Sequence, residues 1–180
     1  MRKRTIASIA VTGLLLFPSN GLCQSLKSAS VRASEEAVTA AHKMAEQVFA
    51  DFKAGETEKI AKSLVAQLGH AWDAQTRIKN MNDFKAKLDM IELSPPAGSY
   101  GKLDGYDLLK ESFLPGTNRY FRLTYITYHE TSVLLWEFRY YVKPDGKPTL
   151  LFVSWSENNP FEFLTASEML IDQWYAAPKF

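Results

Sequence analysis

The chain has very little cysteine, since Cys23 is the only one among 180 residues. It stands at the end of a stretch typical of a secretory signal peptide, where three basic residues at positions 2–4 precede an apolar run at 6–17. We expect cleavage after Cys23; cleavage after Gly21 and a lipid anchor on Cys23 are the alternatives. After the first cut the mature chain has no cysteine, which excludes disulfides, iron–sulfur clusters and thiol chemistry.

The chain also lacks an apolar run long enough for a bilayer span, because the stretch 6–17 is too short. We therefore expect a periplasmic or secreted protein with no stable membrane span once the signal is removed. The predicted organisation is a signal peptide at 1–23, a flexible lead at 24–33 and one domain at 34–180. That length is sufficient for a single hydrophobic core.

Neither sign of charge is in excess, since 21 Lys and Arg stand against 20 Asp and Glu. Loss of the three basic residues at positions 2–4 changes the formal charge from +1 to about −2. This balance argues against a nucleic-acid partner.

Histidine is scarce, with three in the chain. His42 lies beside the apolar stripe of a predicted helix with no adjacent partner, and we interpret it as a surface or partly buried residue. His70 is three residues from Asp73, which is a weak acid–base pair. His129 lies at a predicted hairpin tip with one carboxylate beside it, too few ligands for a metal site. We therefore predict no catalytic residue, no metal and no cofactor.

What the chain has in abundance is aromatic and β-branched residues, in three runs at 120–128, 133–142 and 149–156. Such residues suit strands of a half-buried sheet. Asp145-Gly146 between the last two runs is typical of a type I′ turn, which fixes their register. The turn pairs Val142 with Thr149, Tyr140 with Leu151, Phe138 with Val153, and Trp136 with Trp155.

The preceding hairpin is predicted to turn at Thr131-Ser132, which pairs Tyr125 with Phe138. A slip of one residue would bring Arg122 and Arg139 into the apolar layer, so the pattern supports this register. One face then carries Phe121, Leu123, Tyr125, Trp136, Phe138, Tyr140, Val142, Leu151, Val153 and Trp155.

The opposite face is mixed and includes four apolar residues that could form a contact surface. We predict that a homodimer would use this patch, which consists of Ile126, Tyr141, Leu150 and Phe152.

The N-terminal half has helical periodicity. Ser34 is the expected cap of a first helix that ends at Gly55, and Thr57 is the expected cap of a second. Asn82 is predicted to cap a shorter third helix that ends before Pro95.

Two further elements complete the prediction: a first strand at 106–114 and a short helix at 165–175. The amphipathic helices require an apolar layer to cover, and the sheet supplies it. The sequence therefore predicts an α+β fold, with N-terminal helices on an antiparallel sheet of four or more strands.

This layout, with the helix end at 49–55, the Gly98 to Gly101 loop and the strands of Trp136 and Trp155, resembles the nuclear transport factor 2-like superfamily. That fold is a cone with a strongly curved sheet, also seen in ketosteroid isomerase, SnoaL-like cyclases and cystatin-like proteins. The chain is similar to exported bacterial members of the group over most of its mature length. The resemblance implies a curved, cone-like sheet.

The resemblance also implies a pocket at the open end of the cone, which in the enzymes holds an acidic base or a histidine–aspartate pair. The predicted inner face offers no carboxylate. Its candidate ligand-binding residues are Tyr125, Thr127, Trp136, Tyr140 and Trp155, although all five could simply fill the core.

We therefore favour an exported, non-enzymatic domain that binds a small apolar molecule or a protein partner. One alternative is an isomerase- or hydrolase-like enzyme with a carboxylate base, Asp104 or Asp107, at the cone mouth. The other alternative is a self-associating structural module.

Overall fold

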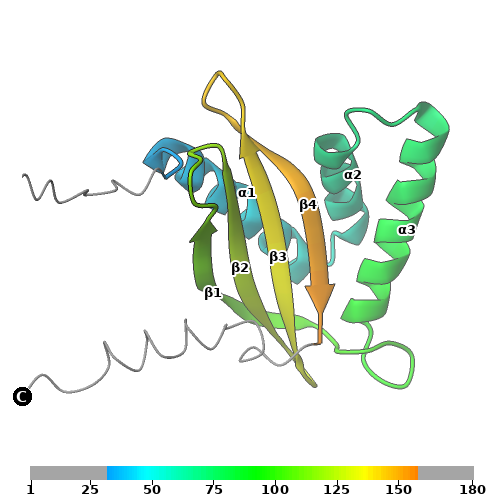
Figure 1. Ribbon diagram of the computed structural model, residues 1–180. Coiled ribbons are helices and arrows are strands. Elements are labelled where there is room, and N and C mark those ends of the chain that lie inside the picture. The colour runs from blue at the N-terminus through cyan, green and yellow to red at the C-terminus, as the bar shows by residue number, and fades with distance from the viewer. Residues whose placement is uncertain (1–31, 158–180) are drawn as a thin grey trace, which may run out of the picture.

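The computed structural model describes residues 32–157. Three helices precede four strands, which form one antiparallel sheet in the order β1-β2-β3-β4 (Figure 1). This confirms the α+β class and the helices-before-strands order. The predicted signal peptide, the 165–175 helix and all but two residues of the lead lie outside the described residues. The elements are α1 (Glu35–Lys53), α2 (Thr57–Leu68), α3 (Ala74–Glu92), β1 (Leu103–Phe113), β2 (Tyr120–His129), β3 (Val133–Val142) and β4 (Pro148–Ser156).

Helix α1 has the predicted ends. The Ser34 side chain accepts a hydrogen bond from the Ala37 amide, and Gly55 follows the helix with a φ of 75°. Glu35 and Glu36 in the first turn complement the positive end of the helix dipole. The buried side of α1 includes Phe49 and Phe52, which places its apolar stripe against the sheet.

Helix α3 begins at Ala74, so the prediction that Asn82 caps it is wrong. The Asp73 carboxylate accepts a hydrogen bond from the Thr76 amide at 2.7 Å and caps the helix there. Few residues of the first two turns are apolar and none is buried, so periodicity could not detect them. Thr57 is likewise not a cap: its hydroxyl donates to Asp89 Oδ1 at 2.5 Å and joins α2 to α3.

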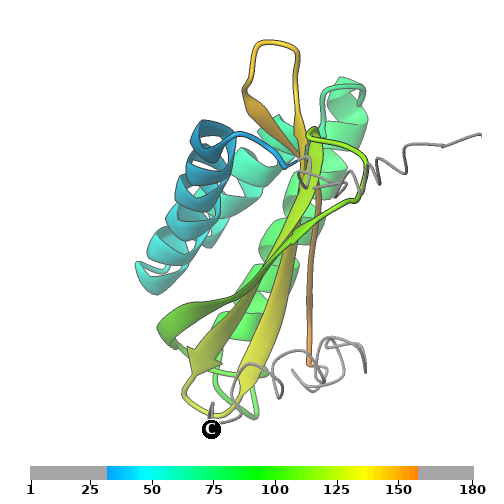
Figure 2. The ribbon, with the colours of Figure 1, turned by 60° about the vertical axis from the view of Figure 1, so that its left-hand side comes forward.

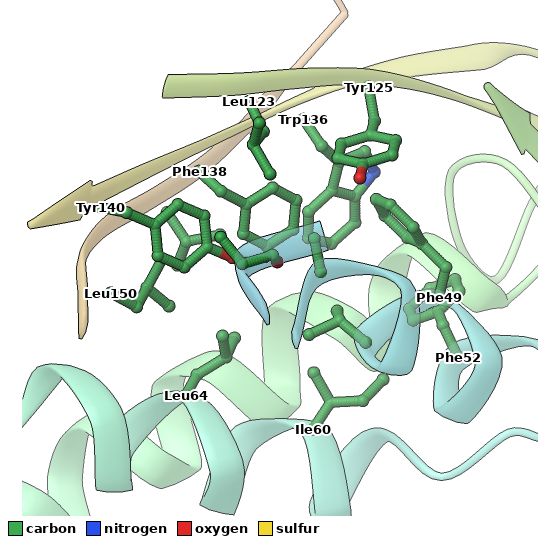
Figure 3. Close-up of a cluster of buried hydrophobic side chains, with 14 of the residues drawn as sticks. Phe49, Phe52, Ile60, Leu64, Leu123, Tyr125, Trp136, Phe138, Tyr140 and Leu150 are labelled. Carbon is green, nitrogen blue, oxygen red and sulfur yellow. The ribbon is translucent and has the colours of Figure 1, made fainter. Parts of the chain in front are cut away.

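The β3–β4 hairpin confirms two predicted pairs, Phe138 with Val153 and Trp136 with Trp155. The pairing of Tyr140 with Leu151 is wrong, because Tyr140 pairs with Leu150 after an irregularity in β4. As a result Leu150 is 2% exposed and lies beside Tyr140 in the core, whereas Leu151 is 51% exposed (Figure 3).

The turn between β3 and β4 causes this change of register. The Gly146 amide donates to Lys143 O at 2.9 Å, which makes Pro144 and Asp145 the central residues. Pro144 favours the second position of a type I turn, and Gly146 then takes a φ of 81°. The loop therefore has three residues instead of two, so Val142 pairs with Pro148, not with Thr149. Leu151 is left without a cross-strand partner in the register.

The β2–β3 hairpin turns one residue earlier than predicted, since the His129 amide donates to Ser132 O at 2.9 Å. Tyr125 therefore pairs with Trp136, not with Phe138. The register differs from the prediction by two residues, so each side chain keeps its predicted face.

The core lies between α1 and the sheet face that we call the inner face. Phe49 of α1 contacts the rings of Tyr125, Trp136 and Phe138, with centroid distances of 5.2, 5.5 and 5.8 Å (Figure 3). The Tyr140 hydroxyl donates to Ala41 O at 3.1 Å. Burial of each such side chain stabilises the fold by roughly 1.5–3 kcal/mol.

The opposite sheet face, the outer face, has no helix of the described residues over it (Figure 2). Helices α2 and α3 pack together beside β4, on the same side as α1 (Figure 1). Within residues 32–157 there is no helix with the length and hydrophobicity that a bilayer crossing requires.

Candidate binding groove and polar networks

Four of the five candidate ligand-binding residues lie fully inside the core. Tyr125, Thr127, Trp136 and Tyr140 are each 1% exposed. Trp155 differs, because it is only partly buried and borders open space. Its ring packs on Trp136 with a centroid distance of 4.8 Å, so the core holds it in place.

Trp155 lies at a groove of about 580 Å³ between the second half of α3 and the end of β4. This volume falls in the range of small-molecule sites. The groove is lined mainly by apolar surface, with polar groups among its lining residues. These residues are Ala86, Lys87, Met90, Ile91, Ser99, Tyr100, Leu134, Trp155, Ser156 and Glu157.

The main polar pair in this groove is already satisfied, because the Tyr100 hydroxyl donates to the Glu157 carboxylate. The hydrogen bond does not neutralise the Glu157 charge, but it gives this carboxylate a partner when an apolar molecule lies against Trp155.

A buried polar network lies behind the groove, with the Thr127 hydroxyl at its centre. Trp136 Nε1 donates to Thr127 Oγ1 at 3.0 Å, and His129 Nε2 lies 3.0 Å from the same oxygen. His129 Nδ1 lies 3.1 Å from Gly101 O. A carbonyl can only accept, so neutral His129 carries its proton on Nδ1, and Nε2 accepts from the Thr127 hydroxyl.

His129 is therefore not the solvated hairpin-tip residue that the sequence suggested. It continues the inward alternation of β2, and the rings of Phe52 and Tyr100 lie against it at centroid distances of 5.8 and 5.9 Å. Burial lowers the pKa of the His129 imidazole, and the hydrogen bond to Gly101 opposes this shift only in part. The imidazole is thus kept neutral and acts as a structural link.

A second network joins α1 to the sheet through His42. Its Nδ1 lies 2.6 Å from the Tyr125 hydroxyl, and its Nε2 lies 2.7 Å from Glu111 Oε1. An ionised carboxylate only accepts, so Nε2 donates to Glu111; in a neutral imidazole Nδ1 then accepts from the Tyr125 hydroxyl. Burial is the main cause that raises the pKa of Tyr125, which keeps its hydroxyl protonated as this donor.

Sequence reasoning missed this network, because the partners of His42 are 83 and 69 residues away. It also missed that Glu111, opposite Leu123, puts a carboxylate on the inner face. The alternation of side chains along β1 places Glu111 on the inner face once the register of β1 with β2 is known. The three groups have the order of a catalytic triad, carboxylate, imidazole and hydroxyl, and the residue that carries the hydroxyl, Tyr125, is buried.

The carboxylates proposed for an enzyme are both exposed. Asp107 faces the outer side, where it accepts a hydrogen bond from the Tyr128 hydroxyl at 2.9 Å. Asp104 holds α1 through its carbonyl oxygen, which accepts from Lys53 Nζ at 2.6 Å. Among residues 32–157, no group of three or more His, Cys, Asp or Glu is placed to hold a metal ion.

The predicted dimer patch is only partly on the outer face. Ile126 is buried there, Tyr141 is half-buried and Phe152 is exposed. The prediction that Leu150 belongs to this patch is wrong, because the irregularity in β4 turns its side chain into the core. The guanidinium of Arg139 lies over the Phe152 ring at 4.4 Å.

Comparisons of the chain with protein-family models, with curated proteins and with solved structures find no match. Of the features described, the groove at Trp155 is the one with room for a ligand against a predicted site residue.

Proposed function

We propose that this chain is an exported, non-enzymatic domain of the nuclear transport factor 2-like type, which binds a small apolar molecule in the α3–β4 groove. The groove of about 580 Å³ at Trp155 carries this proposal. The order of three helices before an antiparallel sheet supports the family, and the curved cone is part of the proposal. The signal-peptide pattern at 1–23 supports export.

The chemistry of the lining favours an apolar ligand. The apolar surface comes from Met90, Ile91, Leu134 and Trp155, and Met90 is 51% exposed. Methionine adapts its shape to different apolar partners. The Trp155 ring, which packs at a tilt of 35° on the buried Trp136, gives the groove a rigid aromatic wall.

The test is a titration with the neutral apolar dye N-phenyl-1-naphthylamine, followed by dye emission. Met90→Gln should weaken binding about fivefold, because roughly 1 kcal/mol of apolar contact is lost. Ile78→Gln is the matched control: Ile78 is on the same helix, is 52% exposed and lines a different groove. Equal effects of the two substitutions, or no saturable dye binding, would contradict the proposal.

Self-association through the outer face is a second proposal, favoured by the exposure of Tyr128 and Phe152 on a face with no helix over it in the described residues. A dimer in size-exclusion chromatography with light scattering, weakened by Phe152→Ser, would support it. A monomer at all accessible concentrations would count against it.

A further inference from the structure

A second concave site lies on the outer face, at the end of the sheet opposite the α3–β4 groove. It has a volume of about 280 Å³ and lies where β1 ends and β2 begins. Its lining combines apolar side chains with two arginines: Ser112, Phe113, Leu114, Pro115, Tyr120, Phe121, Arg122 and Arg139.

The two arginines are directly opposite each other in the β2–β3 register. Like charges in that position destabilise a sheet unless something balances them. Glu137 balances these charges in part: its carboxylate accepts a hydrogen bond from Arg139 Nε, and Arg122 Nη1 lies 3.5 Å from its other oxygen. Among the described residues no other carboxylate forms an ion pair with either arginine. Two guanidiniums thus share one carboxylate, which leaves one positive charge in excess.

Arg122 is also loosely held. Its contacts to Glu137 and to Ser112 Oγ are 3.5 and 3.4 Å long, beyond the usual length of a strong charge-assisted hydrogen bond. Arg139 is fixed more firmly, by Glu137 and by the Phe152 ring. The pocket therefore has one anchored and one adjustable guanidinium, each with donors for an added anion.

We propose that this outer-face pocket binds a small organic monocarboxylate with a short apolar tail. The carboxylate lies on Arg122 and Arg139, and the tail lies against Leu114 and Pro115. A single negative charge neutralises the excess positive charge. The apolar wall favours a ligand with an apolar part over a bare inorganic anion.

Glu137 competes with the ligand for the same guanidiniums. Its neutralisation in Glu137→Gln should therefore strengthen carboxylate binding, about threefold or more. A residue that only supports the fold would have the opposite effect, because its loss would loosen the site. The direction of the change in carboxylate affinity therefore distinguishes a binding site from a structural ion-pair cluster.

The experiment is a titration of the isotope-labelled protein with hexanoate at constant ionic strength, followed by amide shifts at the ends of β1 and β2. Arg122→Gln should weaken binding about tenfold. Arg119→Gln is the matched control, because Arg119 stacks on Tyr141 at the same end of the sheet and does not line the pocket. If Arg122→Gln does not fold, Arg122→Lys keeps the charge without the planar fork and should show a smaller loss.

Hexanol and inorganic phosphate complete the test. We expect neither to bind as tightly as hexanoate, since one lacks the charge and the other the tail. The proposal is overturned if either binds equally well, if Arg119→Gln has the effect of Arg122→Gln, or if Glu137→Gln weakens binding or leaves it unchanged. None of these outcomes depends on the α3–β4 groove.

Discussion

Replacing Thr127 with valine tests how much the buried polar network stabilises the fold. The substitution keeps the size and β-branching of the side chain and replaces the hydroxyl with a methyl group. That oxygen accepts from Trp136 Nε1 at 3.0 Å and lies 3.0 Å from His129 Nε2. Both partners are buried and would be left without their hydrogen bond.

The magnitude follows from these two orphaned groups. Each costs roughly 1–3 kcal/mol when left unpaired, and valine's added methyl returns less than about 1 kcal/mol. We therefore expect Thr127→Val to lower the free energy of unfolding by about 2–4 kcal/mol. Thr127→Ser keeps the hydroxyl and loses one buried methyl, so its cost should be about 1 kcal/mol.

The measurement is urea unfolding followed by circular dichroism, which does not depend on the fluorescence of Trp136. The free energy of unfolding is compared among wild type, valine and serine variants at pH 7. A serine variant less stable than the valine variant would refute the reasoning, since methyl packing would then outweigh the hydrogen bonds. So would a valine variant within about 0.5 kcal/mol of wild type.

Three further predictions test the register, the histidine and a turn. Leu150→Ala should cost about 2–5 kcal/mol of unfolding free energy, and Leu151→Ala less than about 0.5 kcal/mol; equal costs would contradict the register of β4. The pKa of folded His129 lies below its unfolded value, so the stability present above about pH 6.5 is lost as pH falls towards the folded-state pKa. His129→Gln should flatten this pH dependence in urea unfolding, and an unchanged slope would exclude His129 as its source. Gly101→Ala should cost more stability than Gly116→Ala in thermal unfolding. Both glycines have a φ near 80°, but a Cβ at Gly101 would lie within 2.9 Å of side-chain atoms of Glu130 and Ser94, whereas Gly116 faces open space. Equal costs would mean that only the backbone conformation matters.

The sheet was largely predictable because its signal is local. Alternation along β2 and β3 placed Phe121, Leu123, Tyr125, Trp136 and Phe138 on the buried face, as observed. An error of two residues in the β2–β3 register left every face unchanged.

The β4 error arose where the local signal is absent. Leu150, Leu151 and Phe152 are consecutive apolar residues, so alternation cannot show which of them points inward. The turn decides, and Pro144 there favours a three-residue loop over the two-residue turn that Asp145-Gly146 indicates.

The polar networks were not predictable from one sequence. His42 meets Glu111 and Tyr125 only because α1 lies across the inner face of the sheet. No spacing in the chain encodes that crossing. Sequence reasoning identified one residue of the groove, Trp155, as a candidate. It could not identify the groove itself, because the other wall of the groove is α3.

The hydrogen bond from Tyr140 to Ala41 joins residues 99 positions apart. A ribosome therefore completes α1 long before it makes the strands that shield this helix. Until then the ring of Phe49 has no aromatic neighbours from β2 and β3 to pack on. Folding that depends on contacts between residues so far apart is slow. The newly made chain must therefore avoid aggregation while the apolar side of α1 is exposed, until β2 and β3 have been made.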